Sequence, residues 1–394
     1  MQILSSSRLD IEKAAQALLE GLLVAFPTET VYGLGADARN PHALARVFEA
    51  KRRPAFDPLI IHLARREELE QVANVGALPE SRRALVAVLA ENLWPGPLTL
   101  VLPKQDWVPD LATSGLPTVA VRVPAHPVAQ ALLQTAGIPV AAPSANPFGY
   151  LSPTCSEHVV SQLGDRVDYV IDGGMCPVGL ESTVLDMTGP CPTILRPGGV
   201  AQDQIEALIG PVNAIDRTAE RPTAPGQLPS HYAPRALLYL YERGSIPGLE
   251  QLYPLIEEAL GGTGRPTPLE LSGQRGGSKL FPPHGGEADF PLRWGLLFFD
   301  PPSRDAWLKQ FDPSVAEGSV PMGVDPVPEV QILSEHSQVR EAATHLFKVL
   351  HHFDDTGVAL IFAERVPQEG LGVALNDRLF KARAAAKGTF KYHP

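Results

Sequence analysis

Short apolar segments alternate with helix-like segments along the first 205 or so residues, and this alternation constrains the fold more than any other feature. Helical spacing and helix boundary signals mark residues 8–20, 40–52, 80–92 and 127–136. Short apolar runs predict strands at 22–26, 59–63, 98–102, 118–123, 139–142, 168–171, 182–187 and 193–195. Such alternation is typical of an α/β domain, which we place at 1–209. The spacing leaves the order of the strands open.

The remaining chain divides into a proline-rich connection and a second domain. Residues 210–235 hold five prolines and favour neither a long helix nor a central strand. A connection of this length is either a linker or a functional segment, and we expect a linker that folds as a lid. A smaller α/β, Rossmann-like domain is predicted for 236–394, with strands and helices at 237–241, 247–260, 294–299, 338–352, 357–362 and 375–387. Residues 261–291, rich in Gly and Pro, predict a mobile loop.

Composition excludes several classes of protein. The 394 residues carry 33 basic and 44 acidic side chains, a formal charge of −11, which disfavours a chain-wide nucleic-acid or anionic-membrane surface. No apolar run approaches the length of a membrane span, and the first 20 residues lack the apolar core of a secretory signal. Three cysteines without Cys-x-x-Cys spacing disfavour a disulfide framework or a cysteine zinc site. We expect a cytoplasmic protein that has no membrane partner.

Two motifs in the first third of the chain suggest an anion site. Residues 26–35 (FPTETVYGLG) leave a strand and offer hydroxyls, a carboxylate and glycines that permit close approach of a ligand, although a tight turn explains them equally simply. Lys51 and Arg53 lie at the end of a predicted helix. They either favour the helix dipole or clamp phosphate. His62, at the end of the next strand, is more often a hydrogen-bonded histidine than a catalyst.

Further polar residues lie at the ends of later strands. Arg122 closes an apolar strand, where it faces either solvent or an anion in a cleft. Ser144 and Asn146 follow the next strand, where open α/β sheets bind ligands. Motifs around Ser182 and Arg196, and the segment 231–234 (HYAP), add to this set. Together these residues predict a pocket for a phosphorylated ligand plus a smaller anion.

Seven motifs occur in one order and carry a family resemblance. They are PTETVYGLG (27–35), KRRP (51–54), WPGPLT (94–99), TVAVR (118–122), PSAN (143–146), EST (181–183) and HYAP (231–234). Through them the chain resembles the YrdC family of threonylcarbamoyl-AMP synthases in their long, two-domain form. Residues 370–379 (GLGVALNDRL) with Lys381 and Ala382 resemble the end of the extra domain of that form. The resemblance implies a twisted mixed sheet with flanking helices and a central cleft.

The resemblance also implies a reaction and a set of site residues. L-threonine, bicarbonate and ATP would give threonylcarbamoyl-adenylate and pyrophosphate, and a transferase would use the product to modify an adenosine in tRNA. Lys51 and Arg53 are implied as catalytic. Nucleotide contacts are implied for Lys51, Arg53, Asp57, Thr118, Ser144, Asn146, Ser152, Arg196 and Tyr232. Threonine contacts are implied for Thr30, His62, Arg122, Ala142 and Ser182.

The expected cofactor is Mg²⁺, which would arrive with ATP. It would also let the Asp57 carboxylate approach a triphosphate without repulsion. We expect no direct binding of tRNA. Three alternatives stay open at this point: an RNA-binding module, another carbamoyl-adenylating maturation factor of the same fold, and a regulatory protein with a decayed site. The acidic balance counts against the first, the lack of zinc-finger cysteines against the second, and the intact Lys51, Arg53, Ser144 and Asn146 set against the third.

Overall fold

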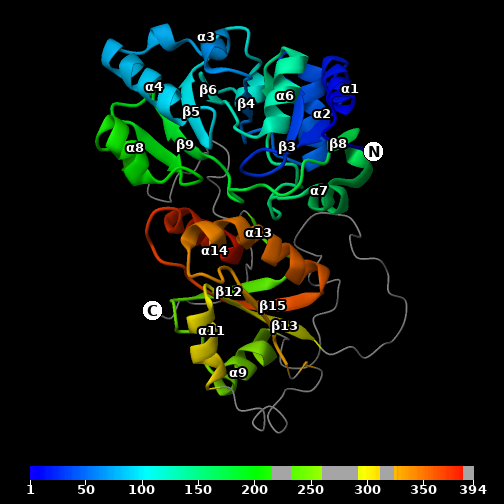
Figure 1. Cartoon of the computed structure of the whole chain (residues 1–394), viewed down its shortest axis with the longest axis vertical. Helices are drawn as coiled ribbons and strands as arrows, with labels where there is room; N and C mark the ends of the chain where they lie inside the picture. Colours follow the sequence, from blue (N-terminus) through cyan, green and yellow to red (C-terminus); the bar gives the residue numbers. More distant parts are fainter. Residues whose placement is uncertain (215–231, 260–291, 311–323, 326, 385–394) are drawn as a thin grey trace. The chain divides into compact units, whose positions relative to one another are not determined.

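The computed structural model describes residues 1–214, 232–259, 292–310, 324–325 and 327–384, and its chain forms two compact units (Figure 1). Unit 1 comprises 1–234, 338–352 and 366–394, and unit 2 comprises 235–337 and 353–365. The two units therefore interleave in the sequence, whereas the sequence predicts domain, linker and domain in simple succession. Most of the predicted linker, 215–231, and the predicted loop 261–291 lie outside the described residues.

The described strands of unit 1 form one mixed sheet. Their order is β1-β8-β2-β3-β7-β4-β6-β5-β9-β10-β11. The strands are β1 (Gln2–Leu4), β2 (Val24–Phe26), β3 (Gly33–Asp37), β4 (Ile60–His62), β5 (Leu98–Pro103), β6 (Thr118–Arg122), β7 (Val140–Ala141), β8 (Tyr169–Ile171), β9 (Thr183–Asp186), β10 (Thr193–Arg196) and β11 (Asn213–Ala214). Strand β6 pairs parallel with β4 and antiparallel with β5, so the predicted mixed sheet is confirmed.

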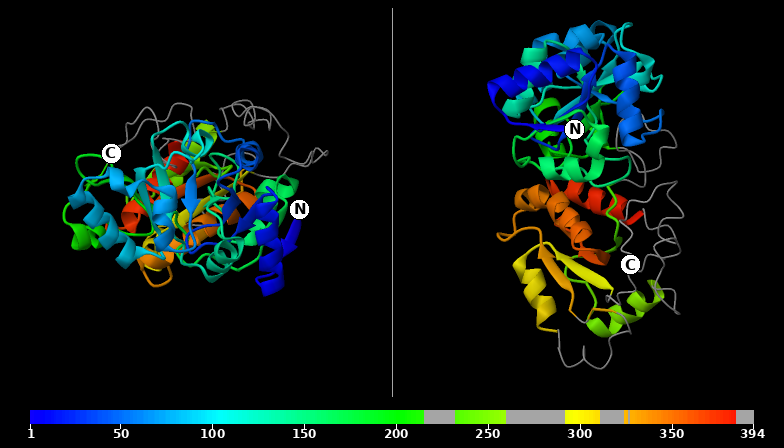
Figure 2. Two further views of the ribbon diagram at one scale, coloured as in Figure 1. Left: turned by 90° about the horizontal axis from the view of Figure 1, so that it is seen from above. Right: turned by 90° about the vertical axis from the view of Figure 1, so that its right-hand side faces the viewer.

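Helices cover both faces of this sheet (Figure 2). They are α1 (Arg8–Leu19), α2 (Pro41–Lys51), α3 (Leu69–Val72), α4 (Glu80–Leu93), α5 (Asp110–Thr113), α6 (Pro127–Ala136), α7 (Ser156–Leu163) and α8 (Gln202–Ile209), with single 3₁₀ turns at Arg66–Glu68, Val75–Ala77 and Gly164–Arg166. Successive side chains of a strand point to opposite faces. Val24 and Phe26 of β2 accordingly join a core with α1 and α6, while Ala25 joins a second core with α2 and α4.

Local sequence signals explain where helix α2 begins and ends. The Asn40 side chain accepts hydrogen bonds from the first turn, and Pro41 occupies the first helical position, as the sequence predicts. Arg52 ends the helix in the left-handed conformation with φ of 52°. The backbone therefore turns sharply between Lys51 and Arg53.

Strand β3 corrects the interpretation of residues 33–35 as a tight turn. These residues pair antiparallel with β2. A Cβ at Gly35 would lie 2.8 Å from the ring of Phe26, so only glycine permits this close approach. The glycines of the motif therefore belong to a strand of the sheet and allow it to pack closely against Phe26. The short elements β1, α7 and α8 were likewise not predicted, because each has too few residues for a clear period.

Two helices from late in the chain belong to unit 1. They are α13 (Val339–Asp355), up to His352, and α14 (Gly372–Ala384). On α13, the Thr344 hydroxyl donates to the carbonyl of Pro177 at 3.0 Å. The His351 ring lies 3.2 Å from the carbonyl of Ser152 and stacks on His158 at 3.7 Å between centroids. The contacts of α14 reach the pocket described below.

Unit 2 contains a smaller parallel sheet, which confirms the predicted second α/β fold. Its strands are β12 (Leu237–Tyr241), β13 (Arg293–Phe298), β14 (Glu329–Ile332) and β15 (Val358–Glu364), in the order β12-β15-β13-β14. Helices α9 (Leu249–Ala259) and α11 (Pro301–Leu308) are also part of the unit. Trp294, Phe298 and Phe362 from the sheet share a buried core with Leu252 and Trp307 from the helices.

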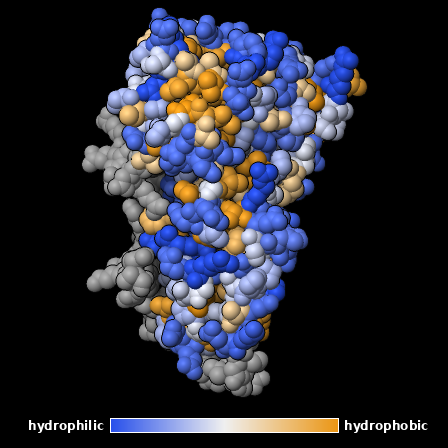
Figure 3. Space-filling view, turned by 60° about the vertical axis from the view of Figure 1, so that its left-hand side comes forward, coloured by the Kyte–Doolittle hydropathy of each residue, from blue (hydrophilic) through white to orange (hydrophobic). Residues whose placement is uncertain are grey.

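No helix within the described residues is long and apolar enough to cross a membrane. The face drawn in Figure 3 is mostly hydrophilic, with apolar residues gathered in its upper part.

Candidate active site

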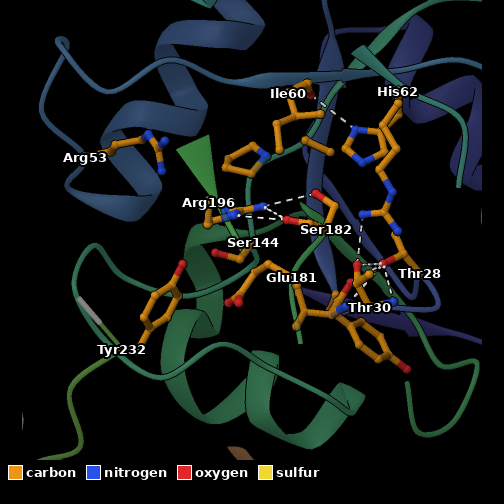
Figure 4. Close-up of a pocket in the computed structure, with 16 residues that line it drawn as sticks. Thr28, Thr30, Arg53, Ile60, His62, Ser144, Glu181, Ser182, Arg196 and Tyr232 are labelled. Atoms are coloured by element: carbon orange, nitrogen blue, oxygen red, sulfur yellow. Dashed lines mark hydrogen bonds between the residues drawn. The ribbon is translucent and has the colours of Figure 1, made fainter. Parts of the chain in front are cut away.

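A pocket with several polar side chains in its lining lies in unit 1 and has a volume of about 510 Å³, its open mouth included (Figure 4). It is lined by Thr28, Thr30, Val31, Tyr32, Gly33, Arg53, Ile60, His62, Arg122, Ala142, Pro143, Ser144, Glu181, Ser182, Arg196 and Tyr232. In Figure 4, Arg53 and Tyr232 lie at one side, and Thr28, Thr30 and His62 lie at the other. Ser182 and Arg196 lie between these two groups. The pocket thus has two ends.

Arg122 dominates one end, and the sheet fixes its position. It ends β6 directly beside His62 of the parallel strand β4. Its guanidinium donates to the Thr30 hydroxyl at 2.9 Å and to the carbonyl of Gly96 at 3.2 Å, and it pairs with the Glu29 carboxylate at 2.6 Å. Arg122 is only 3% exposed. These contacts hold the planar group in one orientation, which suits two parallel hydrogen bonds to a ligand carboxylate.

Apart from the Glu29 carboxylate, hydroxyl and imidazole groups lie near Arg122. The Thr28 and Thr30 hydroxyls lie 2.7 Å apart, and the Thr28 hydroxyl donates to the carbonyl of Val31. His62 Nδ1 lies 3.2 Å from the carbonyl of Ile60. Burial, with a further contribution from the Arg122 charge, lowers the pKa of His62 to about 3. His62 is therefore neutral at physiological pH and can donate or accept one hydrogen bond at each ring nitrogen.

Arg53 supplies the cation at the other end. Its Nε donates to the carbonyl of Asp57 at 2.9 Å and its Nη2 to that of Pro58 at 2.7 Å. Nη2 also pairs with the Asp57 carboxylate at 2.9 Å. Asp57 is fully buried and does not line the pocket, so the structure makes it the partner of Arg53. Within the described part of the chain, Nη1 of Arg53 has no hydrogen bond. Arg53 itself lines the pocket.

Lys51, a predicted nucleotide contact, does not itself line the pocket. Its ammonium donates to the backbone carbonyls of Ser144 and Asn146, and the residue is 1% exposed and absent from the pocket lining. Burial lowers the pKa of Lys51 well below its usual range, and the charge of Arg53 lowers it further. The attraction of two carbonyls thus directs Lys51 to the loop 144–146. Within that loop, the Asn146 amide donates to the carbonyls of Pro147 and Tyr150, and only Ser144 lines the pocket.

Ser182 and Arg196 form the middle of the pocket on neighbouring strand ends. The Arg196 guanidinium donates to the Ser182 carbonyl at 2.9 Å and to the Ser182 hydroxyl at 3.1 Å. That hydroxyl also lies 2.7 Å from the Thr99 hydroxyl. Gly198 permits this arrangement, because a Cβ there would lie 2.3 Å from the carbonyl oxygen of Glu181. The glycine therefore lets the segment after Arg196 lie directly against the segment that carries Ser182.

Glu181 and Tyr232 also line the pocket. One Glu181 oxygen accepts from the Ser152 hydroxyl, and the other pairs with Arg378 of α14 at 2.8 Å. Burial raises the pKa of Glu181, but Arg378, Arg196 and Ser152 outweigh this effect and hold it below the usual value. Tyr232 is 1% exposed, has a positive φ of 62°, and its pKa is raised by burial to about 12. Its phenol is therefore neutral.

The structure brings together nine of the fourteen predicted site residues: Thr30, Arg53, His62, Arg122, Ala142, Ser144, Ser182, Arg196 and Tyr232. Five do not line the pocket: Lys51, Asp57, Thr118, Asn146 and Ser152. Thr118 begins β6, so it lies at the opposite end of that strand from Arg122. His231 lies outside the described residues.

Several site residues were not predicted. Thr28, Glu29 and Glu181 lie inside motifs that the sequence analysis quotes, so the motifs carried a signal that was not resolved to single residues. Arg378 also lies inside a quoted motif, residues 370–379, but nothing in that motif indicates contact with a residue almost 200 positions earlier.

The fold and the pocket first define a class: an α/β protein with a two-ended pocket that is lined by three arginines together with hydroxyl and imidazole groups. Comparison with known proteins identifies the family. The family model described as "Telomere recombination" (Sua5, YciO and YrdC) matches residues 16–198. The model described as "Threonylcarbamoyl-AMP synthase, C-terminal domain" matches residues 200–385. The chain belongs to the family of threonylcarbamoyl-AMP synthases.

Individual relatives resemble the chain along its length. The threonylcarbamoyl-AMP synthase of Bacillus subtilis is 38% identical over 96% of this chain and 94% of its own. That of Pyrococcus abyssi is 39% identical over 94% of this chain and 93% of its own. The solved structure of P. abyssi Sua5 complexed with L-threonine has a TM-score of 0.74, with 37% identity over 97% of this chain and 98% of that chain. A His/Tyr-to-Ala double variant of P. abyssi Sua5 has a TM-score of 0.73, with 37% identity over 97% of this chain and 96% of that chain.

Proposed function

We propose that the protein joins L-threonine, bicarbonate and ATP into threonylcarbamoyl-adenylate, with release of pyrophosphate. One observation carries the proposal: a single pocket presents Arg122 with neutral hydrogen-bonding groups at one end and Arg53 with Tyr232 at the other. The arginine at each end suits one anionic group, the carboxylate of an amino acid at one end and the phosphates of a nucleotide at the other. The name of the relatives and the threonine complex of P. abyssi Sua5 support the same assignment.

We place threonine at the end that contains Arg122. Three contacts already fix the guanidinium, yet Nη1 and Nη2 each carry a second hydrogen for a carboxylate. The neutral groups of Thr30, His62 and Ser182 suit the hydroxyl and the amine of threonine, because they leave the amine uncharged when it reacts. A site built to hydrogen-bond a substrate hydroxyl discriminates strongly against an analogue that lacks it.

We place ATP at the end that contains Arg53. Arg53, Ser144, Arg196 and Tyr232 line the pocket and would contact the nucleotide, while Ala142, which also lines the pocket, stays a proposed threonine contact. Lys51 and Asn146 act indirectly in this proposal, by holding the loop that presents Ser144. Asp57 and Ser152 likewise act through their partners, Arg53 and Glu181. Thr118 receives no role here.

The chemistry then proceeds in two balanced steps. The free amine of threonine adds to bicarbonate, and water leaves as the carbamate forms. A carbamate oxygen attacks the α-phosphorus of ATP, the bond to the β-phosphate bridging oxygen breaks, and pyrophosphate leaves. Such phosphoryl chemistry depends on positioning and charge neutralisation more than on a protein nucleophile. Arg53 and Arg196 supply fixed positive charge for both tasks.

Mg²⁺ enters the proposal as part of the substrate, MgATP. The described residues hold no cluster of three or more histidine, cysteine or carboxylate side chains that would bind a metal by themselves. In the proposal, Mg²⁺ would take most of its ligands from phosphate oxygens and water. When bound, it neutralises the phosphate charge that develops on pyrophosphate.

The remaining expectations concern the surroundings of the reaction. The product is an activated acyl donor, which a tRNA threonylcarbamoyl transferase would consume, and we place the reaction in the cytoplasm.

The proposed activity is tested by incubation of the protein with MgATP, bicarbonate and one amino acid at a time, with pyrophosphate and the adenylate measured together. Release that depends jointly on threonine and bicarbonate is expected. Equal release with alanine, or without any amino acid, contradicts the proposal.

A further inference from the structure

Arg378 is a fully buried cation with a full set of partners. It lies on α14 and is 1% exposed. Its Nε pairs with Glu181 at 2.8 Å, its Nη1 with Asp377 at 2.6 Å, and its Nη2 donates to the carbonyl of Pro197 at 3.0 Å. Its guanidinium carbon lies 4.8 Å from the ring centroid of Tyr232. Two of these partners, Glu181 and Tyr232, line the pocket.

The contacts form a chain of alternating charges. Glu181 pairs with Arg378, Arg378 with Asp377, and Asp377 with Lys381 at 2.8 Å, one helical turn later. All four side chains are buried. A buried charge is tolerated only when it is paired and hydrogen-bonded, so each member of the chain depends on the next. The end of this chain that reaches the pocket is the Glu181 carboxylate.

Glu181 presents a problem for a nucleotide site. It lines the pocket as an anion, and an uncompensated anion repels a triphosphate. Arg378 and the Ser152 hydroxyl occupy one oxygen each, so both oxygens of the carboxylate are engaged by groups other than the ligand. The guanidinium cancels the charge at the same place where it fixes the carboxylate.

We propose that Arg378 is a positioning residue for the nucleotide end of the pocket, which acts by neutralising and orienting Glu181. The inference rests on the proposed function in one respect only, that ATP binds beside Glu181. It goes beyond that function by giving the C-terminal helix α14 a defined part in nucleotide affinity. The contribution depends on the charge of Glu181, and this dependence separates it from a merely structural role.

The test compares equilibrium dissociation constants for ATP and for threonine, measured by calorimetry on the full chain. Arg378→Met keeps the length and an apolar contact with Tyr232 but removes the charge. It should raise the dissociation constant for ATP by at least about tenfold, the effect of one uncompensated charge beside a polyanion. The dissociation constant for threonine should change less than about twofold. Arg383→Met, on the same helix, is the matched control, because Arg383 stacks on Phe380 and does not contact the pocket lining. It should bind both ligands like the unaltered protein.

The decisive comparison uses Glu181→Gln as a second background. Adding Arg378→Met to Glu181→Gln should change ATP affinity less than about threefold, because the carboxylate that lines the pocket is then gone, and Asp377, which does not line it, keeps its pair with Lys381. A further loss of tenfold or more in that background overturns the proposal, as does normal ATP affinity of Arg378→Met alone. If Arg378→Met does not fold, the comparison between Glu181→Gln and the double variant still decides. Failure of the unaltered protein to bind ATP refutes the proposed function instead.

Discussion

Replacement of Arg122 by lysine separates geometry from charge at the threonine end. The guanidinium is held by the Gly96 carbonyl, the Thr30 hydroxyl and the Glu29 carboxylate, at 3.2, 2.9 and 2.6 Å. An ammonium keeps the positive charge and can keep the pair with Glu29. It offers donors from a single point, however, and therefore loses one of the two parallel hydrogen bonds to the substrate carboxylate.

The size of the effect follows from that lost bond. A hydrogen bond to a charged group contributes about 1.5–3 kcal/mol, which corresponds to an increase of roughly 10- to 150-fold in the threonine dissociation constant. The ATP dissociation constant should change less than about twofold, because the net charge is unchanged. Calorimetric titration of Arg122→Lys with each ligand measures both values. Arg39→Lys is a suitable control, since Arg39 pairs with Asp37 and does not line the pocket. A variant that loses ATP affinity and keeps threonine affinity would refute the assignment of Arg122.

Two further changes test the geometry of the site. His62 has a folded pKa of about 3, far below its unfolded value, so unfolded chains take up a proton that folded chains refuse and stability falls as pH drops from about 6.5 towards 3. At pH 5 the loss of unfolding free energy from this one group is about 2 kcal/mol. The free energy of unfolding should therefore fall less steeply with decreasing pH in His62→Gln than in the unaltered protein. Parallel curves for the two proteins would contradict the argument that His62 is buried and neutral. Gly198→Ala places a Cβ 2.3 Å from the Glu181 carbonyl oxygen and should lower the thermal midpoint by several degrees, while Gly76→Ala, which meets only the Asn74 side chain at 3.5 Å, should change it little. Equal midpoints for the two variants would show that the segment is not closely packed.

Much of the pocket was predictable because its residues lie where strands end. Arg122 and His62 follow from two apolar runs, and parallel pairing of β4 with β6 places their ends side by side. Ser144, Ser182 and Arg196 also follow strands or lie at their ends. In such cases the local sequence predicts the strand, and pairing of the strands in the sheet brings the residues at their ends together.

Several side chains have partners that the sequence analysis did not indicate. Lys51 is expected at phosphate, and in the structure its ammonium donates to two carbonyls from a loop more than 90 residues later. Asp57 is expected near Mg²⁺ or phosphate, and in the structure it pairs with Arg53, four residues earlier. Arg378 reaches Glu181 from a helix 197 residues later in the sequence. Sequence patterns record that such residues are polar, but only the fold determines which partner each one meets.

The most direct test of the account is joint substrate dependence in a single reaction. The full chain, MgATP and bicarbonate are incubated with L-threonine, L-serine, L-alanine or no amino acid, and pyrophosphate and the adenylate are quantified at early times. The account predicts that threonine gives pyrophosphate and threonylcarbamoyl-AMP in equal amounts, and that omission of either threonine or bicarbonate reduces both to background. Pyrophosphate release that is unchanged without bicarbonate, or equal for threonine and alanine, would contradict the assignment of the two-ended pocket.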